Sequence, residues 1–199
     1  MISFLTQQSE LKSQILEGRY IRYPKIESLL NDFNHKQVGT SAKGLPVHVL
    51  TMGNGPIKVL MWSQMHGNES TSTKGIMDVL YFLKANPRLL TPFTIQLIPM
   101  LNPDGAAAYT RVNANAIDLN RDAQQQSQPE TLTLFKVYDA FQPDYCLNLH
   151  DQRTIFGVDD NPCMLSYLSP AADADKSITK ARELAMGIIG HMNEQLQQH

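Results

Sequence analysis

Short runs of apolar residues along the chain predict the strands of a sheet. Runs of this kind, bounded by glycine, proline or asparagine, are typical of strands buried in a core. The predicted strands span residues 37–40, 47–52, 57–62, 94–100 and 144–149. Between the second and third of these strands lies Gly53-Asn54-Gly55-Pro56. This segment is rich in turn-forming residues and favours a β-hairpin that joins the two strands.

Stretches in which apolar residues recur every three or four positions predict helices between the strands. Residues 24–34, for example, have Pro24 in the first turn and Ile26, Leu29 and Leu30 on one face. The predicted helices span residues 8–17, 24–34, 70–85, 129–141 and 173–197. Because helices alternate with strands, we expect an α/β fold, with a mixed, mostly parallel twisted sheet and helices on both faces.

Two further segments connect the predicted elements. Asn102-Pro103-Asp104-Gly105 predicts a turn after the fourth strand. Residues 105–128 then show little periodicity, and so long an irregular stretch inside a compact domain is usually functional. No repeat or linker divides the chain, so we expect a single domain over residues 1–199.

Composition and charge narrow the class of protein. The net charge of -2 gives no electrostatic reason to expect a nucleic acid or an anionic membrane as a partner. No apolar run reaches the ~18 residues of a membrane span, and residues 1–8 lack the basic and apolar regions of a signal peptide. We therefore expect a cytoplasmic protein. Cys146 in a predicted strand and Cys163 in a loop argue against a disulfide framework.

Candidate metal ligands follow two of the predicted strands. His66 and Glu69 lie in the loop after the third strand, and His150 directly follows the fifth. In open α/β sheets, ligands bind outside the carboxyl ends of the strands, where these residues lie. Two imidazoles and one carboxylate form the ligand set of a catalytic zinc that keeps one position open for water. The pattern predicts a zinc hydrolase.

The His66–Glu69 pair has an alternative interpretation when it is taken alone. A solvated loop histidine beside a glutamate that complements a helix dipole would have the same spacing. The additional histidine, His150, at a second strand end favours the metal site. The remaining histidines are interpreted as structural or solvated: His35, His48, His191 and His199.

Asp118, Asn120 and Arg121 form a second polar cluster. An arginine beside an asparagine offers a planar fork and an amide donor, which suit a carboxylate. Asp118 could orient a ligating imidazole through its second ring nitrogen. A polar surface loop with an exposed ion pair, worth ~0.5 kcal/mol, is the alternative. Arg111 is a further candidate cation or a surface arginine, and Tyr109 either lines a cleft or packs.

Taken together, these elements resemble the zinc carboxypeptidases of the carboxypeptidase A/B type. The matching elements occur in the family's order, between about residues 36 and 151. They are His66-Gly67-Asn68-Glu69, Asn102-Pro103-Asp104-Gly105, Arg111, Asp118-Leu119-Asn120-Arg121 and His150.

The resemblance implies a zinc ion held by His66, Glu69 and His150, with Asp118 as the hydrogen-bond partner of His66. It also implies a metallocarboxypeptidase that hydrolyses the C-terminal peptide bond of a peptide with a zinc-activated water. In these enzymes zinc lowers the pKa of its bound water and polarises the scissile carbonyl.

The resemblance further implies roles for the polar clusters. Arg111 would polarise the scissile carbonyl and hold the developing oxyanion. Asn120 and Arg121 would bind the free carboxylate of the substrate.

The chain departs from the family's pattern after His150. The family's catalytic glutamate lies on a later strand, whereas the only later glutamates here, Glu183 and Glu194, fall in the last predicted helix. We therefore expect the chain to be a fragment that lacks the C-terminal strands and the general base. The alternative is a natural short form that binds zinc without turnover.

Two other functions remain compatible with the motifs. An N-acyl-amino-acid deacylase of the aspartoacylase type would share the His-Gly-x-Glu and Asp-Leu-Asn-Arg elements, although the intact segment from Asn102 to Gly105 favours a peptidase. A non-catalytic zinc or peptide-binding module would account for the missing general base.

Overall fold

The computed structural model describes residues 16–151, 157–158, 161–162 and 178–196. The chain forms two compact units, Met1–Arg153 and Thr154–His199. Within the smaller unit, α6 (Lys180–Leu196) lies inside the predicted helix 173–197, and β6 (Gly157–Val158) pairs antiparallel with β7 (Asn161–Pro162). The predicted helix 8–17 lies almost wholly outside the described residues. The single domain over residues 1–199 stays a prediction.

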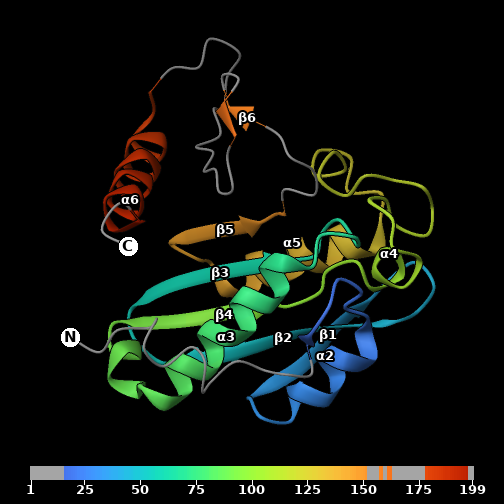
Figure 1. Ribbon diagram of the computed structural model, residues 1–199, viewed down its shortest axis with the longest axis horizontal. Coiled ribbons are helices and arrows are strands. Elements are labelled where there is room, and N and C mark those ends of the chain that lie inside the picture. Colours follow the sequence, from blue (N-terminus) through green and yellow to red (C-terminus); the bar gives the residue numbers. More distant parts are fainter. Residues whose placement is uncertain (1–15, 152–156, 159–160, 163–177, 197–199) are drawn as a thin grey trace. The chain divides into compact units, whose positions relative to one another are not determined.

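The larger unit is built on a five-stranded mixed sheet (Figure 1). Its strands are β1 (His35–Thr40), β2 (Pro46–Gly53), β3 (Ile57–Ser63), β4 (Phe93–Ile98) and β5 (Tyr145–Leu149). Their order across the sheet is β1-β2-β4-β3-β5. β2 is antiparallel to β1 and β4, whereas β3 is parallel to β4 and β5. The predicted mixed α/β fold is therefore confirmed, and its parallel part is β3 with its two neighbours.

The predicted hairpin between β2 and β3 is wrong, because β4 lies between these strands. Residues 54–56 instead cross the start of β4, where the N–H of Gly55 donates to the carbonyl of Phe93 at 3.0 Å. A Cβ on Gly53 would lie 2.3 Å from that carbonyl oxygen, and Gly53 has a φ of +73°. The glycines therefore allow a close crossing over β4. A turn-like composition does not identify which strand becomes the neighbour.

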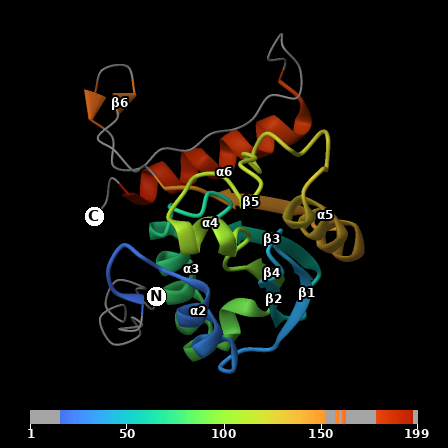
Figure 2. The same ribbon diagram turned by 90° about the vertical axis from the view of Figure 1, so that its right-hand side faces the viewer.

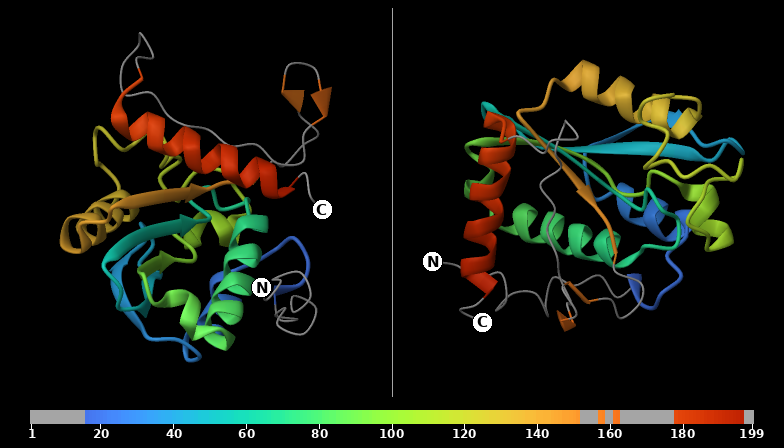
Figure 3. Two further views of the ribbon diagram at one scale, coloured as in Figure 1. Left: turned by 90° about the vertical axis from the view of Figure 1, so that its left-hand side faces the viewer. Right: turned by 90° about the horizontal axis from the view of Figure 1, so that it is seen from above.

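Helices cover both faces of the sheet (Figures 1, 2 and 3). On one face lie α2 (Tyr23–Leu30) and α3 (Thr71–Ala85), and on the other lies α5 (Pro129–Phe141). The short elements η2 (Pro87–Leu90) and α4 (Pro103–Ala108) precede and follow β4. None of the helices in the described part of the chain is long and apolar enough to span a membrane.

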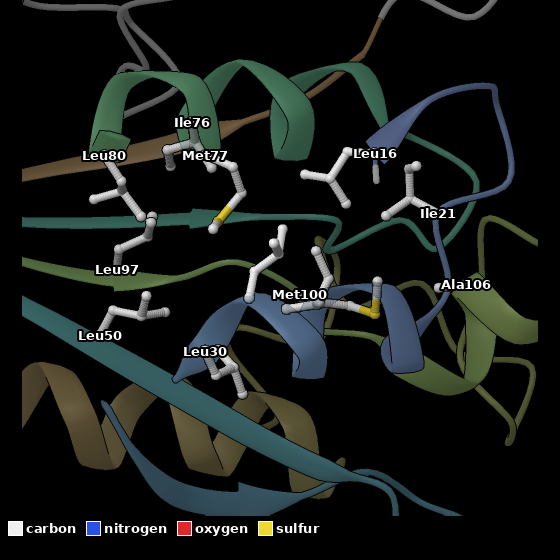
Figure 4. Packing of buried hydrophobic residues seen from close by; sticks show 12 residues of the cluster. Leu16, Ile21, Leu30, Leu50, Ile76, Met77, Leu80, Leu97, Met100 and Ala106 are labelled. Atoms are coloured by element: carbon white, nitrogen blue, oxygen red, sulfur yellow. The ribbon is translucent and has the colours of Figure 1, made fainter. Parts of the chain in front are cut away.

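The alternation of side chains along the strands gives each face its own core. Leu50 of β2 and Leu97 of β4 pack with Met77 and Leu80 of α3 (Figure 4). Their neighbours in sequence, such as Ile98, belong to the core of the other face. That second core contains Val47, Val49, Leu60, Ile98, Leu119, Leu134, Val137 and Phe141. Because both faces are buried, the strands hold a fixed register, which sets where the loops at their ends lie.

The predicted turn at residues 102–105 is the beginning of α4. The side chain of Asn102 caps this helix by accepting a hydrogen bond from the N–H of Gly105 at 2.8 Å. Pro103 occupies the first helical turn, where its missing N–H has no cost. A turn and a helix start use the same residues, so the sequence alone did not separate them.

Candidate metal centre

The first two candidate ligands lie in a tight turn between β3 and α3. The N–H of Glu69 donates to the carbonyl of His66 at 3.0 Å, which closes a turn with Gly67 and Asn68 at its centre. His66 and Glu69 are only 1% and 4% exposed. The alternative of a solvated loop histidine is therefore excluded for His66.

Gly67 is required by the backbone that packs against this turn. A Cβ on Gly67 would lie 1.9 Å from the carbonyl carbon of Gly105 and 2.1 Å from the nitrogen of Ala106, both in α4. Asn102 supports the same contact, because its amide donates to the carbonyl of Met65 at 3.2 Å. The segment from Asn102 to Gly105 therefore packs against and supports the turn from His66 to Glu69, which we call the ligand turn.

His150 reaches the same place from the neighbouring strand. Ser63 at the end of β3 pairs in register with Leu149 at the end of parallel β5. Their following loops therefore leave the sheet at one edge. One donor atom each from His66, Glu69 and His150 lies within 4.8 Å of the others. In the described residues, these three form the one group of this kind.

Glu69 lies between the two imidazoles. Its Oε1 is 2.8 Å from Nδ1 of His66, and its Oε2 is 2.9 Å from Nδ1 of His150. Burial by itself would raise the pKa of Glu69, but the hydrogen bonds with His150 and His66 outweigh it and lower the pKa to about 2. The carboxylate therefore stays ionised at neutral pH, as a metal ligand requires.

Asp118 occupies the other side of the His66 ring. Its Oδ1 lies 3.0 Å from Nε2 of His66 and also accepts from the N–H of Asn120 at 2.9 Å. Burial opposes ionisation of Asp118, but hydrogen bonds from Arg111 and His66 lower its pKa. An ionised carboxylate at Nε2 favours a proton there, so that a metal could take the Nδ1 lone pair in place of the present contact with Glu69.

Arg111 links the two carboxylates. Its Nε donates to Oδ2 of Asp118 at 3.0 Å, and its Nη1 lies 3.5 Å from Oε1 of Glu69. The side chain is 48% exposed, so part of the guanidinium faces solvent beside the candidate ligands. The sequence identified Arg111 as a candidate cation. It did not indicate the contacts with both Asp118 and Glu69, because no local sequence pattern relates these three residues.

Asn120 and Arg121 lie at the rim of the cluster. The N–H of Arg121 donates to the carbonyl of Asp118 at 2.9 Å, and its exposed side chain has no hydrogen bond or ion pair within the described residues. Asn120 accepts from Asn148 at 3.4 Å. Asn120 also lines a cavity of about 250 Å³ with mostly apolar walls that include Trp62 and Phe135.

The remaining sequence candidates within the described residues lie outside the cluster, and His199 lies outside the described residues. His48 is 3.3 Å from the hydroxyl of Tyr23, in agreement with a structural role, and His191 pairs with Glu194 on the exposed surface of α6. The ring of Tyr109 packs against Tyr20, with centroids 4.6 Å apart. This contact favours the packing interpretation of Tyr109.

Comparisons with known proteins point to one family. A model of the zinc carboxypeptidase family matches residues 27–133. Carboxypeptidase 2 of Trichophyton rubrum is 29% identical over 100 residues, which are 47% of this chain and 19% of that protein. Human carboxypeptidase D is 28% identical over 148 residues, which are 62% of this chain and 10% of that protein. The chain thus spans a small part of the length of these relatives.

Solved structures share the fold. A metallo-carboxypeptidase from Burkholderia cenocepacia superposes with a TM-score of 0.59 at 22% identity, covering 66% of this chain and 42% of that one. Carboxypeptidase A from Helicoverpa armigera has a TM-score of 0.59 at 18% identity, covering 74% and 53%.

Proposed function

The chain belongs to the zinc carboxypeptidase family, and we propose on this basis that the protein is a zinc-dependent hydrolase of C-terminal peptide bonds. The observation that carries the proposal is the convergence of His66, Glu69 and His150 at one edge of the sheet. Their donor atoms match the two-imidazole, one-carboxylate set of a catalytic zinc site. A zinc ion bound there supplies a Lewis acid and a water whose pKa falls toward ~7.

The contacts around the ligands support zinc in particular. Zinc-ligating histidines donate their second ring N–H to a carboxylate or carbonyl. Asp118 lies within hydrogen-bonding distance of His66 in this way, and Glu69 is ionised. In this proposal both features prepare the site before a metal binds.

Arg111 is proposed to hold the oxyanion that develops on the substrate carbonyl. The guanidinium is oriented by Asp118 and lies next to Glu69, and it remains about half exposed. A cation aimed at a developing oxyanion can contribute roughly 3–4 kcal/mol to transition-state stabilisation.

Asn120 and Arg121 are proposed to bind the terminal carboxylate of the substrate. The exposed guanidinium of Arg121 suits a bidentate contact with a carboxylate. The hydrogen bond from its N–H to Asp118 fixes the backbone of this segment relative to the ligand sphere. The cavity lined by Asn120 leaves space next to that side chain.

The general base is proposed to come from outside the described residues. Asp151 lies beside the site, since its N–H donates to Glu69 at 3.2 Å. Its carboxylate, however, accepts a hydrogen bond from the N–H of Thr71 at the start of α3. Asp151 is therefore assigned to holding the start of this helix.

The test compares a peptide with a free C-terminal carboxylate and the same peptide amide, in the whole protein as its gene encodes it. Arg121→Ala should remove the preference for the free acid. Arg111→Ala should mainly lower kcat, because its contact strengthens in the transition state. Arg88→Ala, at an exposed arginine of η2, is the control.

Equal cleavage of acid and amide by the wild type would contradict the carboxylate contact. An endopeptidase or amidase would then replace the carboxypeptidase. The cytoplasmic location also stays a prediction, to be checked by cell fractionation.

A further inference from the structure

Gln64 combines an unusual backbone with complete burial. It has a φ of +48°, in the left-handed region that residues other than glycine rarely adopt. It is 1% exposed and lies directly between β3 and the ligand turn. Such a strained conformation persists only where the surrounding contacts hold it in place, and it is found most often at functional sites.

Three hydrogen bonds hold the side chain of Gln64. Its Nε2 donates to the carbonyl of Ile21 at 3.1 Å and to the carbonyl of Gly67 at 2.9 Å. Its Oε1 accepts from the hydroxyl of Thr73, on α3, at 2.9 Å. Because both carbonyls can only accept, the orientation of the amide is unambiguous. The amide therefore joins the N-terminal segment, the ligand turn and α3.

The contact with Gly67 acts on the peptide group between the two candidate ligands. The Gly67–Asn68 peptide is the central peptide of the turn from His66 to Glu69. Its carbonyl accepts from Gln64, and its N–H donates to the carbonyl of Thr110 at 3.1 Å. A central peptide of a turn can rotate between turn types unless both of its groups are held. Here both are held, one of them by Gln64.

We propose that Gln64 is a positioning residue for the metal centre, which fixes the Gly67–Asn68 peptide and so sets the direction of the His66 and Glu69 side chains. The inference rests on the proposed function, because it takes these two residues as zinc ligands. Gln64 itself does not contact metal or substrate.

The variants separate the side-chain amide from the backbone strain. Gln64→Gly removes the amide and relieves the positive φ, whereas Gln64→Met keeps the length of the side chain and removes its three hydrogen bonds. Gln126 provides a matched control, because it is a glutamine with the same φ of +48° and is exposed. Gln126→Gly therefore relieves the same strain without removing a buried amide.

Two measurements are made on the whole protein. Zinc affinity is obtained by competition with a chelator, and the visible spectrum of the cobalt-substituted protein reports the geometry of the ligands. Both Gln64 variants should bind zinc at least about 10-fold more weakly, the size of effect seen when partners of metal ligands are removed. Both should also shift the cobalt spectrum, and Gln126→Gly should change neither.

Wild-type zinc affinity in the Gln64 variants would overturn the inference. A weaker zinc affinity together with an unchanged cobalt spectrum and a lower melting temperature would also overturn it. A failure of both variants to fold would do the same. Either result would assign Gln64 a structural role only.

A separate measurement distinguishes this inference from the proposed function. In metal-free protein, hydrogen exchange of the Asn68 amide should be slow in the wild type and faster in Gln64→Met. A wild type that binds no zinc would contradict the proposed function, while the exchange rates would still test the hold of Gln64 on the turn. Rapid exchange of this amide in the wild type would overturn the inference.

Discussion

Gly67 determines how closely the ligand turn approaches α4. Gly67→Ala should destabilise the protein by about 1–3 kcal/mol, because the added Cβ meets the backbone of Gly105 and cannot be relieved by a side-chain rotation. Gly75→Ala is the matched control, since Gly75 lies within α3 and a Cβ there has no neighbour within 4 Å. It should stabilise the helix by roughly 0.5–1 kcal/mol. Urea unfolding of the metal-free protein measures both changes.

Asp118 is the second residue whose role can be measured directly. Asp118→Ala should weaken zinc binding by roughly 10- to 100-fold, because Nε2 of His66 would lose the carboxylate that holds its proton. Asp139→Ala, which removes an exposed carboxylate on α5, is the control. Equal zinc titrations of the wild type and Asp118→Ala would remove Asp118 from the metal centre.

The sequence located the candidate ligands because each follows an apolar strand, and the ends of parallel strands meet. It could not identify Gln64, whose importance depends on a left-handed backbone and on three partners distant in the chain. It also could not show that Gly67 lies against the backbone of α4. Local sequence patterns can identify candidate ligands, but the contacts of a buried amide such as that of Gln64 arise only from tertiary packing.

At the scale of elements, the sequence predicted most strands and helices near their observed positions, because apolar periodicity reflects burial directly. The neighbours of the strands were less predictable. The segment from Gly53 to Pro56 has the composition of a hairpin, yet it crosses the start of β4. Which strand fills the sheet between β2 and β3 depends on the packing of α3 and on the pairing energy of residues far along the chain.

The crossing over β4 can be tested with two glycines of positive φ. Gly44→Ala and Gly53→Ala both place a Cβ on a left-handed backbone, at φ +82° and +73°. At Gly44 no atom lies within 4 Å, so the cost should be about 1–2 kcal/mol. At Gly53 the Cβ also meets the carbonyl of Phe93, so the loss in unfolding free energy should be larger. Equal losses in the two variants would show that the contact with β4 is unimportant.

At the scale of the whole molecule, the ionised carboxylates of the metal centre make stability depend on pH. The pKa of Glu69 falls from 4.5 to about 2 in the folded protein. A lowered pKa stabilises the fold fully above the unfolded value, and this contribution is lost as the pH falls through the folded value. The metal-free protein should therefore lose stability between about pH 4.5 and 2.

Glu69→Gln tests this dependence, because it keeps the shape of the side chain and removes its titration. Unfolding free energies measured in urea across this pH range should show a shallower slope than in the wild type. Some slope should remain, since the pKa values of Asp118 and Asp122 are also lowered. Glu17→Gln is the control, because it makes the same change of charge at an exposed glutamate. An identical slope in Glu69→Gln and the wild type would contradict the assignment.

The strand order also determines when β3 can pair with its neighbours during synthesis. β3 carries the loop with His66 and Glu69, yet both of its strand neighbours, β4 and β5, are synthesised after it. Until they are synthesised, β3 has two unpaired edges and an apolar sequence, and such edges pair readily with other chains. Pairings between distant segments also form slowly. Premature release before Leu149 would thus leave an aggregation-prone nascent chain.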